Sequence, residues 1–250
     1  LLSNLVPHYK SIFISDIHLG ARACQADVLC DFLKNNTCDN LFLVGDIVDG
    51  WRLSKKWFWP QSHTNVIRRI LTASKRNTEV YYILGNHDEA LRKFLNFDIS
   101  FGRIKIFDRY NYTTVNGENF LVIHGDQFDG LMLPNTKWLM HVGDAAYNFM
   151  IWVNVHLNRL RKFFGKEYWS LSKFLKSKTK SALNFIYSYE NHIAQYCLSH
   201  NYDGVICGHI HTPVAKTIDN VKYYNTGDMC ENCSALVETV DGDFELIFWK

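Results

Sequence analysis

The chain has 250 residues, which is enough for one large α/β domain or for one domain with a substantial insertion. A hydrophobic content of 47% argues against disorder, and a formal net charge of +2 is too small to indicate a nucleic-acid-binding protein. The seven cysteines form no paired zinc-binding pattern and fit free thiols in a reducing compartment.

Five short apolar runs stop at polar clusters, and helix-length stretches separate the first three runs. The runs are residues 11–14, 41–44, 80–84, 120–123 and 204–207, and the stretches are residues 25–36 and 61–76. Continuous apolar strands that alternate with helices are typical of buried strands in an α/β layered fold. Residues 212–249 are expected to form further short strands and turns.

Each of the five runs is followed by side chains that can bind metal or phosphate. They are Asp16 and His18, Asp46 and Asp49, residues 86–89, His124 and Asp126, and His209 and His211. Sites in α/β sheets lie beyond the C-terminal ends of the strands, so the five clusters can converge on one edge.

Residues 130–200 interrupt this alternation. The segment has long helical patterns and many aromatic residues, and residues 131–190 hold nine Lys and Arg against three acids. That local charge of +6 leaves −4 for the rest of the chain. We therefore expect a single domain over residues 1–250, with residues 130–200 as a helical insertion that caps the site.

The insertion also bears on membrane contact. No secretory signal stands at the N-terminus, and polar residues within the most apolar stretch, residues 138–157, make a spanning helix costly, so we expect a cytoplasmic protein. Basic residues that alternate with aromatic ones are typical of helices that bind anionic headgroups, and Arg159, Arg161 and Lys162 form the densest patch. This patch predicts peripheral contact with an anionic membrane surface. The alternative is a packed cap with solvated lysines.

The polar clusters fit the needs of a pair of metal ions. Two divalent ions about 3.5–4 Å apart need several nitrogen and oxygen ligands, one of them bridging, and Asp46 can bridge through its two oxygens. Asp16 and His18 are two residues apart, as are His209 and His211, which in an extended strand end points both side chains to one side. Imidazole, carboxylate and amide ligands suit Mn, Fe, Zn, Co or Mg.

The order of the motifs resembles that of calcineurin-like metallophosphoesterases. The series is Asp-x-His, Gly-Asp-x-x-Asp, Gly-Asn-His-Asp-Glu, His-Gly-Asp and Gly-His-x-His. The resemblance implies a layered fold of two sheets flanked by helices, and two divalent metal ions, with Mn²⁺ expected. It implies that Asp16, His18, Asp46 and His211 hold one ion, and that Asp46, Asn86, His124 and His209 hold the other.

The same resemblance assigns roles beside the ions. His87 would stabilise charge on the phosphoryl oxygens or protonate the leaving group, and Asp88 would orient His87. Asp49 is either a supporting residue of the site or a turn residue. For Asp126 and Asp228 we favour a loop-stabilising role.

Within the superfamily, the chain resembles bacterial UDP-2,3-diacylglucosamine hydrolases of lipid A synthesis and their close relatives. The resemblance rests on residues 15–20, residues 43–51 and the insertion. It implies cleavage of a diphosphate in a UDP-linked acylated sugar to UMP and a lipid monophosphate. The chain departs from this pattern at His87, where the characterised hydrolases carry Arg, and only His readily donates a proton near neutral pH.

Several substrate contacts are expected, with alternatives. The candidate substrate-binding residues are Asn86, Arg52, Arg159, Arg161 and Lys162. Arg52, Lys55 and Lys56 either bind a diphosphate or are surface charges, and Trp51, Trp57, Phe58 and Trp59 either line a pocket or pack in the core. The alternative function is a general phosphodiesterase or phosphomonoesterase acting on nucleotides or nucleic acid, with the insertion as a stacking platform. Nucleic acid is the less favoured partner, and a non-catalytic scaffold is disfavoured because all seven ligands are present.

Overall fold

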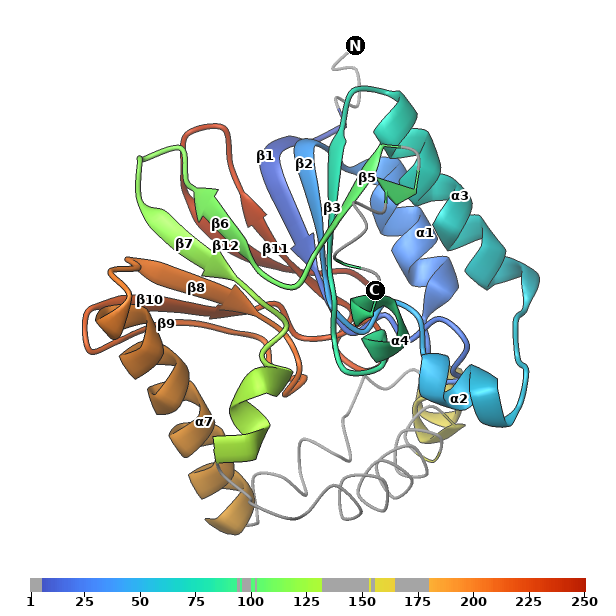
Figure 1. Ribbon diagram of the computed structural model, residues 1–250. Helices are drawn as coiled ribbons and strands as arrows, with labels where there is room; N and C mark the ends of the chain where they lie inside the picture. Colours follow the sequence, from blue (N-terminus) through green and yellow to red (C-terminus); the bar gives the residue numbers. More distant parts are fainter. Residues whose placement is uncertain are drawn as a thin grey trace.

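Two β-sheets face each other, and helices cover the outer face of each sheet (Figure 1). The computed structural model describes residues 6–93, 95, 100–101, 103–131, 153, 156–164 and 180–250. The seven-stranded sheet has the order β12-β11-β1-β2-β3-β5-β4, and the five-stranded sheet has the order β6-β7-β8-β10-β9. The α/β class with two sheets flanked by helices, expected from the sequence, is confirmed.

Parallel strands form the centre of both sheets, and antiparallel strands close their edges. In the larger sheet the parallel strands are β1 (His8–Ile14), β2 (Thr37–Val44), β3 (Glu79–Ile83) and β5 (Ile104–Phe107). Its antiparallel members are β4 (Ser100–Phe101), β11 (Ser234–Glu238) and β12 (Phe244–Phe248). In the smaller sheet β7 (Asn119–Val122), β8 (Gly204–Cys207) and β10 (Val221–Asn225) are parallel, and β6 (Tyr110–Thr113) and β9 (Val214–Ile218) are antiparallel.

The helices fall into two groups. Long helices cover the sheets: α1 (Ala26–Asn35) and α3 (Gln61–Lys75) on the larger sheet, and α7 (Lys180–Ser199) on the smaller one. Short helices lie among the loops at one end of the strands: α2 (Gly50–Lys55), α4 (Glu89–Arg92) and the 3-10 helix η2 (Asp126–Leu131). The two helices expected at residues 25–36 and 61–76 correspond to α1 and α3.

The central strands are apolar throughout because both of their faces are buried. In β1, Ile12 and Ile14 point into the core beneath α1 and α3, whereas Phe13 points into the core between the two sheets. On that inner face the ring of Phe42 stacks between the rings of Phe13 and Tyr81, with centroid distances of 4.7 and 4.5 Å. This aromatic row spans the first three parallel strands and fixes their spacing beneath the loops that follow them.

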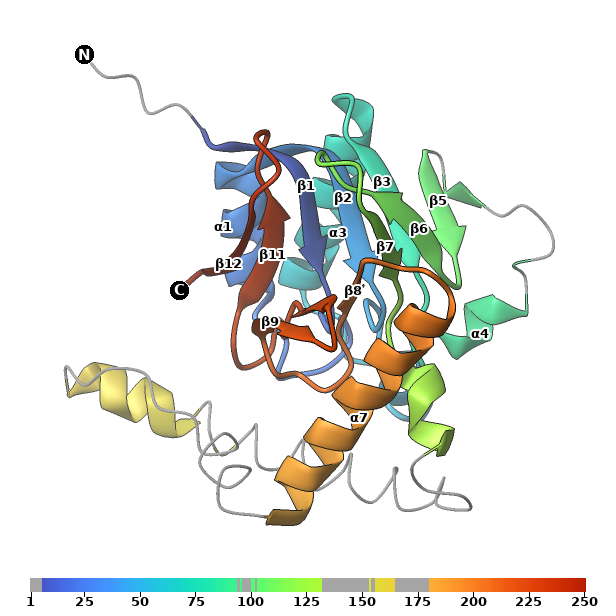
Figure 2. The ribbon, with the colours of Figure 1, turned by 90° about the vertical axis from the view of Figure 1, so that its left-hand side faces the viewer.

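Parts of the insertion are helical where the structure describes it. Residues 156–163 form a helix, and α7 completes the segment before β8. In Figures 1 and 2 the 156–163 helix lies on the side of the molecule where β1 ends. Residues 132–152, 154–155 and 165–179, which include part of the predicted cap and five of its basic residues, lie outside the described residues. Among the described helices, none is long and apolar enough to cross a membrane.

We expect the change Phe42→Ala to lower the free energy of unfolding by about 3–5 kcal/mol, because it empties the centre of the inter-sheet aromatic row. Urea denaturation followed by circular dichroism measures this loss. The matched control is Phe248→Ala on β12, where the side chain is 53% exposed and a change within about 0.5 kcal/mol is expected. Similar losses for the two variants would contradict this description of the core.

Candidate metal centre

The predicted ligands lie on loops that continue the pairing of the strands before them. In the larger sheet the backbone N–H of Asp16 donates to Gly45 O (3.0 Å), and the N–H of His18 donates to Asp46 O (2.9 Å). In the smaller sheet the N–H of Gly208 donates to His124 O (3.1 Å). These bonds hold each pair of loops in register beyond the ends of the strands.

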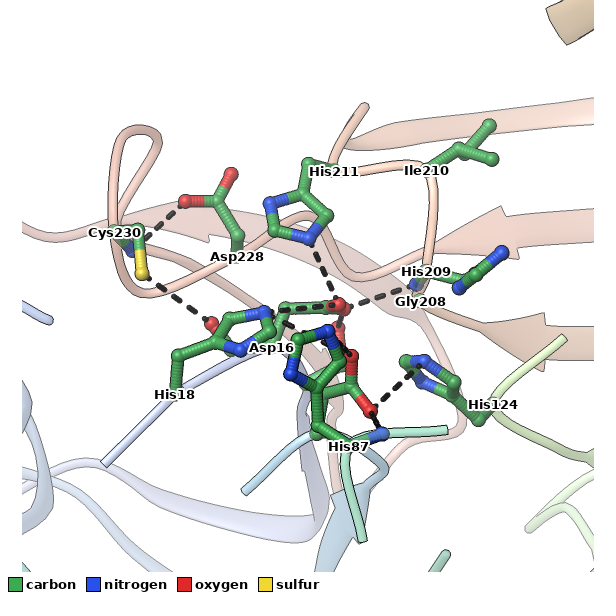
Figure 3. Close-up of polar contacts among 12 residues, drawn as sticks. Asp16, His18, His87, His124, Gly208, His209, Ile210, His211, Asp228 and Cys230 are labelled. Carbon is green, nitrogen blue, oxygen red and sulfur yellow. Dashed lines mark hydrogen bonds and ion pairs between the residues drawn. The ribbon is translucent and has the colours of Figure 1, made fainter. Parts of the chain in front are cut away.

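Two contacts fasten the loops of one sheet to those of the other. The backbone N–H of His209 donates to Asp16 Oδ2 at 3.0 Å, and Nδ1 of His124 lies 3.1 Å from Val44 O. Figure 3 shows the resulting cluster, with His18 and His87 on one side and His124 and His209 on the other. The convergence of the clusters after five strands, expected from the sequence, is what the structure shows.

Five of the seven predicted ligands have left-handed backbone conformations. The φ angles are 50° at Asp16, 51° at His18, 54° at Asp46, 68° at His209 and 51° at His211. Non-glycine residues rarely adopt this region, and each costs on the order of 1–3 kcal/mol unless the surroundings hold it. Such strain concentrates at functional sites, and here it turns side chains from successive loop positions toward one point.

The two oxygens of Asp16, which is fully buried, have different partners. Oδ2 accepts hydrogen bonds from Ser15 Oγ and from the backbone N–H of His209. Oδ1 accepts no hydrogen bond of good geometry from the described residues, although His211 Nε2 lies 3.0 Å away and His18 Nε2 lies 3.9 Å away. A buried carboxylate oxygen directed at two imidazole nitrogens is the arrangement that a bound cation would complete.

Asp46 occupies the centre of the site. Its Oδ1 accepts from the backbone N–H of His87 at 2.9 Å and lies 3.4 Å from Nε2 of His124. Its Oδ2 lies 3.8 Å from Nε2 of both His18 and His87. The two oxygens therefore face histidines on opposite sides, which is the geometry that a bridging carboxylate requires.

Two glycines permit these close approaches. A Cβ at Gly45, whose φ is +78°, would collide with the ring of His124, and a Cβ at Gly85 would collide with Oδ1 of Asp46. Glycine alone therefore allows the loops after β2 and β3 to close around the central carboxylate.

The buried carboxylates and imidazoles of the site shift one another's pKa values. Burial alone would raise the pKa of both Asp16 and Asp46, but neighbouring imidazoles, chiefly His211 and His124 respectively, lower both below their usual range. Burial would lower the pKa of His124, yet Asp46 and Asp16 raise it well above its usual value. Burial dominates at His18 and lowers its pKa. Buried groups with opposed pKa shifts are typical of functional sites.

The residues present fit a pair of divalent cations. Among the described residues, Asp16, His18 and His211 form one group of converging ligand atoms, and Asp16, Asp46 and His124 form another. Asn86 joins the second group, because its Oδ1 lies 3.2 Å from Nε2 of His124. The donor atoms are nitrogen and oxygen only, which suits hard and intermediate divalent ions.

His209 lies beside the second group but is not part of it. Its ring centroid is 5.0 Å from that of His124, and its Nε2 lies 2.7 Å from Oδ2 of Asp129 on η2. The sequence does not mark Asp129, because no motif identifies an aspartate 80 residues before a histidine as its neighbour.

His87 is held by Asp49. Nδ1 of His87 lies 2.9 Å from Asp49 Oδ1, both side chains are buried, and the ring of Trp51 lies against His87 with a centroid distance of 4.2 Å. Since Nδ1 pairs with Asp49, Nε2 is the nitrogen that faces Asp46 and the centre of the site. Burial would raise the pKa of Asp49, but the hydrogen bond with His87 contributes most to lowering it.

Asp88 does not take the place expected for it beside His87. Its carboxylate accepts from the backbone N–H groups of Ile47 (3.2 Å), Val48 (3.1 Å) and Gly85 (3.3 Å) and from the hydroxyl of Tyr82 (2.6 Å). Through these hydrogen bonds the two carboxylate oxygens of Asp88 link the loop after β2 to the loop after β3. Burial, followed by the charge of Asp46, raises the pKa of Asp88 to about 6. Asp49 is therefore the carboxylate that contacts the His87 ring, whereas Asp88 is turned toward the backbone.

The remaining predicted residues separate into supporting and peripheral ones. Arg52 lies against Asp49, with Nε 3.2 Å from Oδ2, and Asp49 Oδ1 caps α2 by accepting from the backbone N–H of Arg52. Asp126 pairs with Arg92 of α4 at 2.8 Å, which fits a loop-stabilising role. Asp228 also fits a loop-stabilising role, because its carboxylate accepts hydrogen bonds from the backbone N–H groups of Cys230 and Glu231.

The aromatic segment after α2 divides between surface and core. Trp57 is 73% exposed, whereas Trp59 packs against the core beneath α3 and donates from Nε1 to Thr64 Oγ1 at 3.1 Å. Phe58 lies under the guanidinium of Arg22 at 4.7 Å. Trp51 differs from Trp57, Phe58 and Trp59. Among the ring contacts of the described residues, its ring is the one of these four that contacts a predicted catalytic residue, His87.

Comparison with known proteins is consistent with this geometry. The family model described as calcineurin-like phosphoesterase matches residues 9–213. The chain is 26% identical over 210 residues to a UDP-2,3-diacylglucosamine hydrolase of Vibrio atlanticus, covering 82% of this chain and 81% of the relative. Proteins with the same name in Blochmanniella pennsylvanica (22% over 213 residues, 83% and 81% covered) and Wigglesworthia glossinidia brevipalpis (23% over 242 residues, 92% and 90%) are also similar.

We expect Asp49→Asn to lower kcat about 10–100-fold, because the amide cannot fix the His87 ring as the carboxylate does. Asparagine still caps α2, so the melting temperature should stay close to that of the wild type. Steady-state kinetics and thermal denaturation measure the two effects.

Asp88→Asn is the comparison for that variant. It places an amide NH₂ against backbone N–H donors, so we expect a loss of about 1–3 kcal/mol in the free energy of unfolding. If Asp49→Asn kept full kcat, the pairing of His87 with Asp49 would have no role in turnover.

Proposed function

Because the chain belongs to the calcineurin-like phosphoesterase family and is a phosphoester hydrolase, we propose that it cleaves the diphosphate of a UDP-linked acylated sugar. The products are UMP and a lipid monophosphate. The observation that carries this proposal is that relatives named UDP-2,3-diacylglucosamine hydrolase align with more than 80% of the chain. All seven predicted metal ligands are also present in the chain.

The predicted ligands would hold two divalent ions, for which we propose Mn²⁺. Asp16, His18 and His211 would bind one ion, Asn86, His124 and His209 the other, and Asp46 both. Bound ions of this kind activate water and stabilise charge on phosphoryl oxygens. The nitrogen and oxygen donors also accept Fe, Zn, Co or Mg, so activity measured with each ion ranks them.

His87 supplies the proton in this proposal. Hydrolysis breaks one P–O bond of the diphosphate, and water provides the new oxygen on one phosphate, while the other phosphate leaves and takes a proton. Nε2 of His87 faces the site, and Asp49 at Nδ1 keeps the ring in that orientation. Asp49 also stabilises the protonated ring, from which the departing oxygen takes its proton. Arg52 stands beside Asp49 and is the proposed contact for the second phosphate.

Mass spectrometry of the products formed from UDP-2,3-diacylglucosamine with Mn²⁺ tests the substrate. We expect UMP and the lipid monophosphate, and a fall of at least about 10²-fold in turnover for His87→Ala, because the proton donor is lost. Cleavage of bis-p-nitrophenyl phosphate without cleavage of the UDP-linked lipid would instead identify a general phosphodiesterase.

We further propose that the 156–163 helix and Phe164 contact an anionic membrane surface and so bring the site to a lipid-linked substrate. Phe163 is 85% exposed, Phe164 67% and Leu160 61%, and Arg159 and Lys162 are also exposed. Exposed aromatic rings beside cations match helices that lie in the headgroup region. For this part of the insertion, the exposure disfavours the alternative of aromatics packed into a cap. The location that follows is peripheral, on the inner face of the inner membrane, with Arg159, Arg161 and Lys162 toward phosphate groups.

The double change Phe163→Ser and Phe164→Ser should lower activity on vesicle-embedded substrate about tenfold or more, since two buried rings would contribute several kcal/mol to membrane binding. Activity on a short-chain, water-soluble analogue should stay within twofold. Phe248→Ser, at another exposed phenylalanine, is the control. Equal losses on both substrates would refute membrane contact through this helix.

A further inference from the structure

His209 is held at two points by two carboxylates from different elements. Its backbone N–H donates to Asp16 Oδ2 at 3.0 Å, and its ring nitrogen Nε2 lies 2.7 Å from Oδ2 of Asp129. The side chains of His209 and Asp129 are only 14% and 15% exposed. A short contact between largely buried groups is much less screened than a surface ion pair.

Asp129 is itself rigidly placed. It lies on η2, whose neighbouring residue Phe128 is buried in the core between the smaller sheet and α7. The ring of Phe128 packs edge-on against Tyr196 of α7 at 5.5 Å, and the N–H of Phe128 donates to Gly125 O at 3.1 Å. The contact with His209 is therefore built into the packing of η2 and does not depend on a surface rotamer.

Tyr189 closes the other side of His209. Its side chain is fully buried, its ring lies 6.0 Å from that of His209, and its hydroxyl fills the space beside Gly125 that a Cβ would take. The rings of His124 and Tyr189 thus restrict the imidazole of His209 on two sides, and Asp129 sets its rotation.

His124 and His209, the two histidines predicted to hold the second ion, differ in which ring nitrogen is engaged. Nδ1 of His124 faces a backbone carbonyl, which leaves Nε2 toward Asp46 and Asn86. Nε2 of His209 faces Asp129, which leaves Nδ1. A neutral imidazole binds a metal through the nitrogen that carries no proton, and its other N–H commonly donates to a carboxylate.

We infer that Asp129 is a positioning residue for the second metal ion: it accepts the Nε2 proton of His209 and so presents Nδ1 as the ligand atom. Asp129 stands outside the seven ligands and contacts the ion only through His209. This inference rests on the two-ion centre of the proposed function and assigns a residue that the sequence motifs leave out.

The test compares the binding of Mn²⁺ to metal-free wild-type protein and to Asp129→Asn by isothermal titration calorimetry and electron paramagnetic resonance. Wild type should bind two ions and show the spectrum of a coupled pair. Asp129→Asn should bind one ion as the wild type does and the other about 10–100-fold more weakly. With two equivalents of Mn²⁺ per chain, this variant should therefore show the spectrum of uncoupled Mn²⁺. Asp129→Glu, which keeps the carboxylate, should recover part of the loss.

Asp219→Asn removes the same charge from an exposed turn, where Asp219 contacts Gln195, and should bind both ions as the wild type does. Thermal denaturation of all variants separates a local effect from unfolding. Unchanged or tighter binding by Asp129→Asn would overturn the inference, since tighter binding would mean that Asp129 competes with the metal for the same nitrogen. Equal weakening of both sites with a lowered melting temperature would also overturn it. Failure of the wild type to bind two ions would instead refute the proposed centre itself.

Discussion

The arrangement of the loops at the site depends on two buried carboxylates, Asp16 and Asp46. Both are almost fully inaccessible to solvent, and imidazoles from both sheets surround them. Charges this deeply buried are costly unless they are paired, and the left-handed backbone of five predicted ligands adds to that cost. Hydrogen bonds from Ser15, His87 and His209 offset part of it. Bound cations would offset more, because they would neutralise Oδ1 of Asp16, which faces imidazole nitrogens and accepts no hydrogen bond of good geometry from the described residues.

The layered sheets explain how such a site is held. The aromatic row of Phe13, Phe42 and Tyr81 fixes the spacing of the strands, and the loops continue the same pairing to the ligands. Asp88, next to His87 in the chain, links two loops by accepting hydrogen bonds from their backbone N–H groups, and so supports the shape of the site. The exposed helix of residues 156–163, for which we propose membrane contact, belongs to another segment of the chain than the predicted ligands.

Much of this could be predicted from the sequence, because it depends on local order. The apolar runs, the polar clusters that follow them and the helices α1 and α3 are all set by short-range patterns. Contacts between distant residues could not be predicted. The sequence favours Asp88, the neighbour of His87 in the chain, as its partner. Only the folded loops turn Asp88 toward backbone N–H groups and bring Asp49 to the His87 ring. The contact of Asp129 with His209 depends on how η2 packs against α7, so the spacing of the two residues in the sequence does not predict it.

We propose that loops from both sheets hold two metal ions with Asp46 between them. Crystals grown with Mn²⁺ and measured at the manganese absorption edge test it most directly. We expect two anomalous peaks about 3.5–4 Å apart, one beside Asp16, His18 and His211 and the other beside Asn86, His124 and His209. A single peak, or two peaks without Asp46 between them, would contradict it.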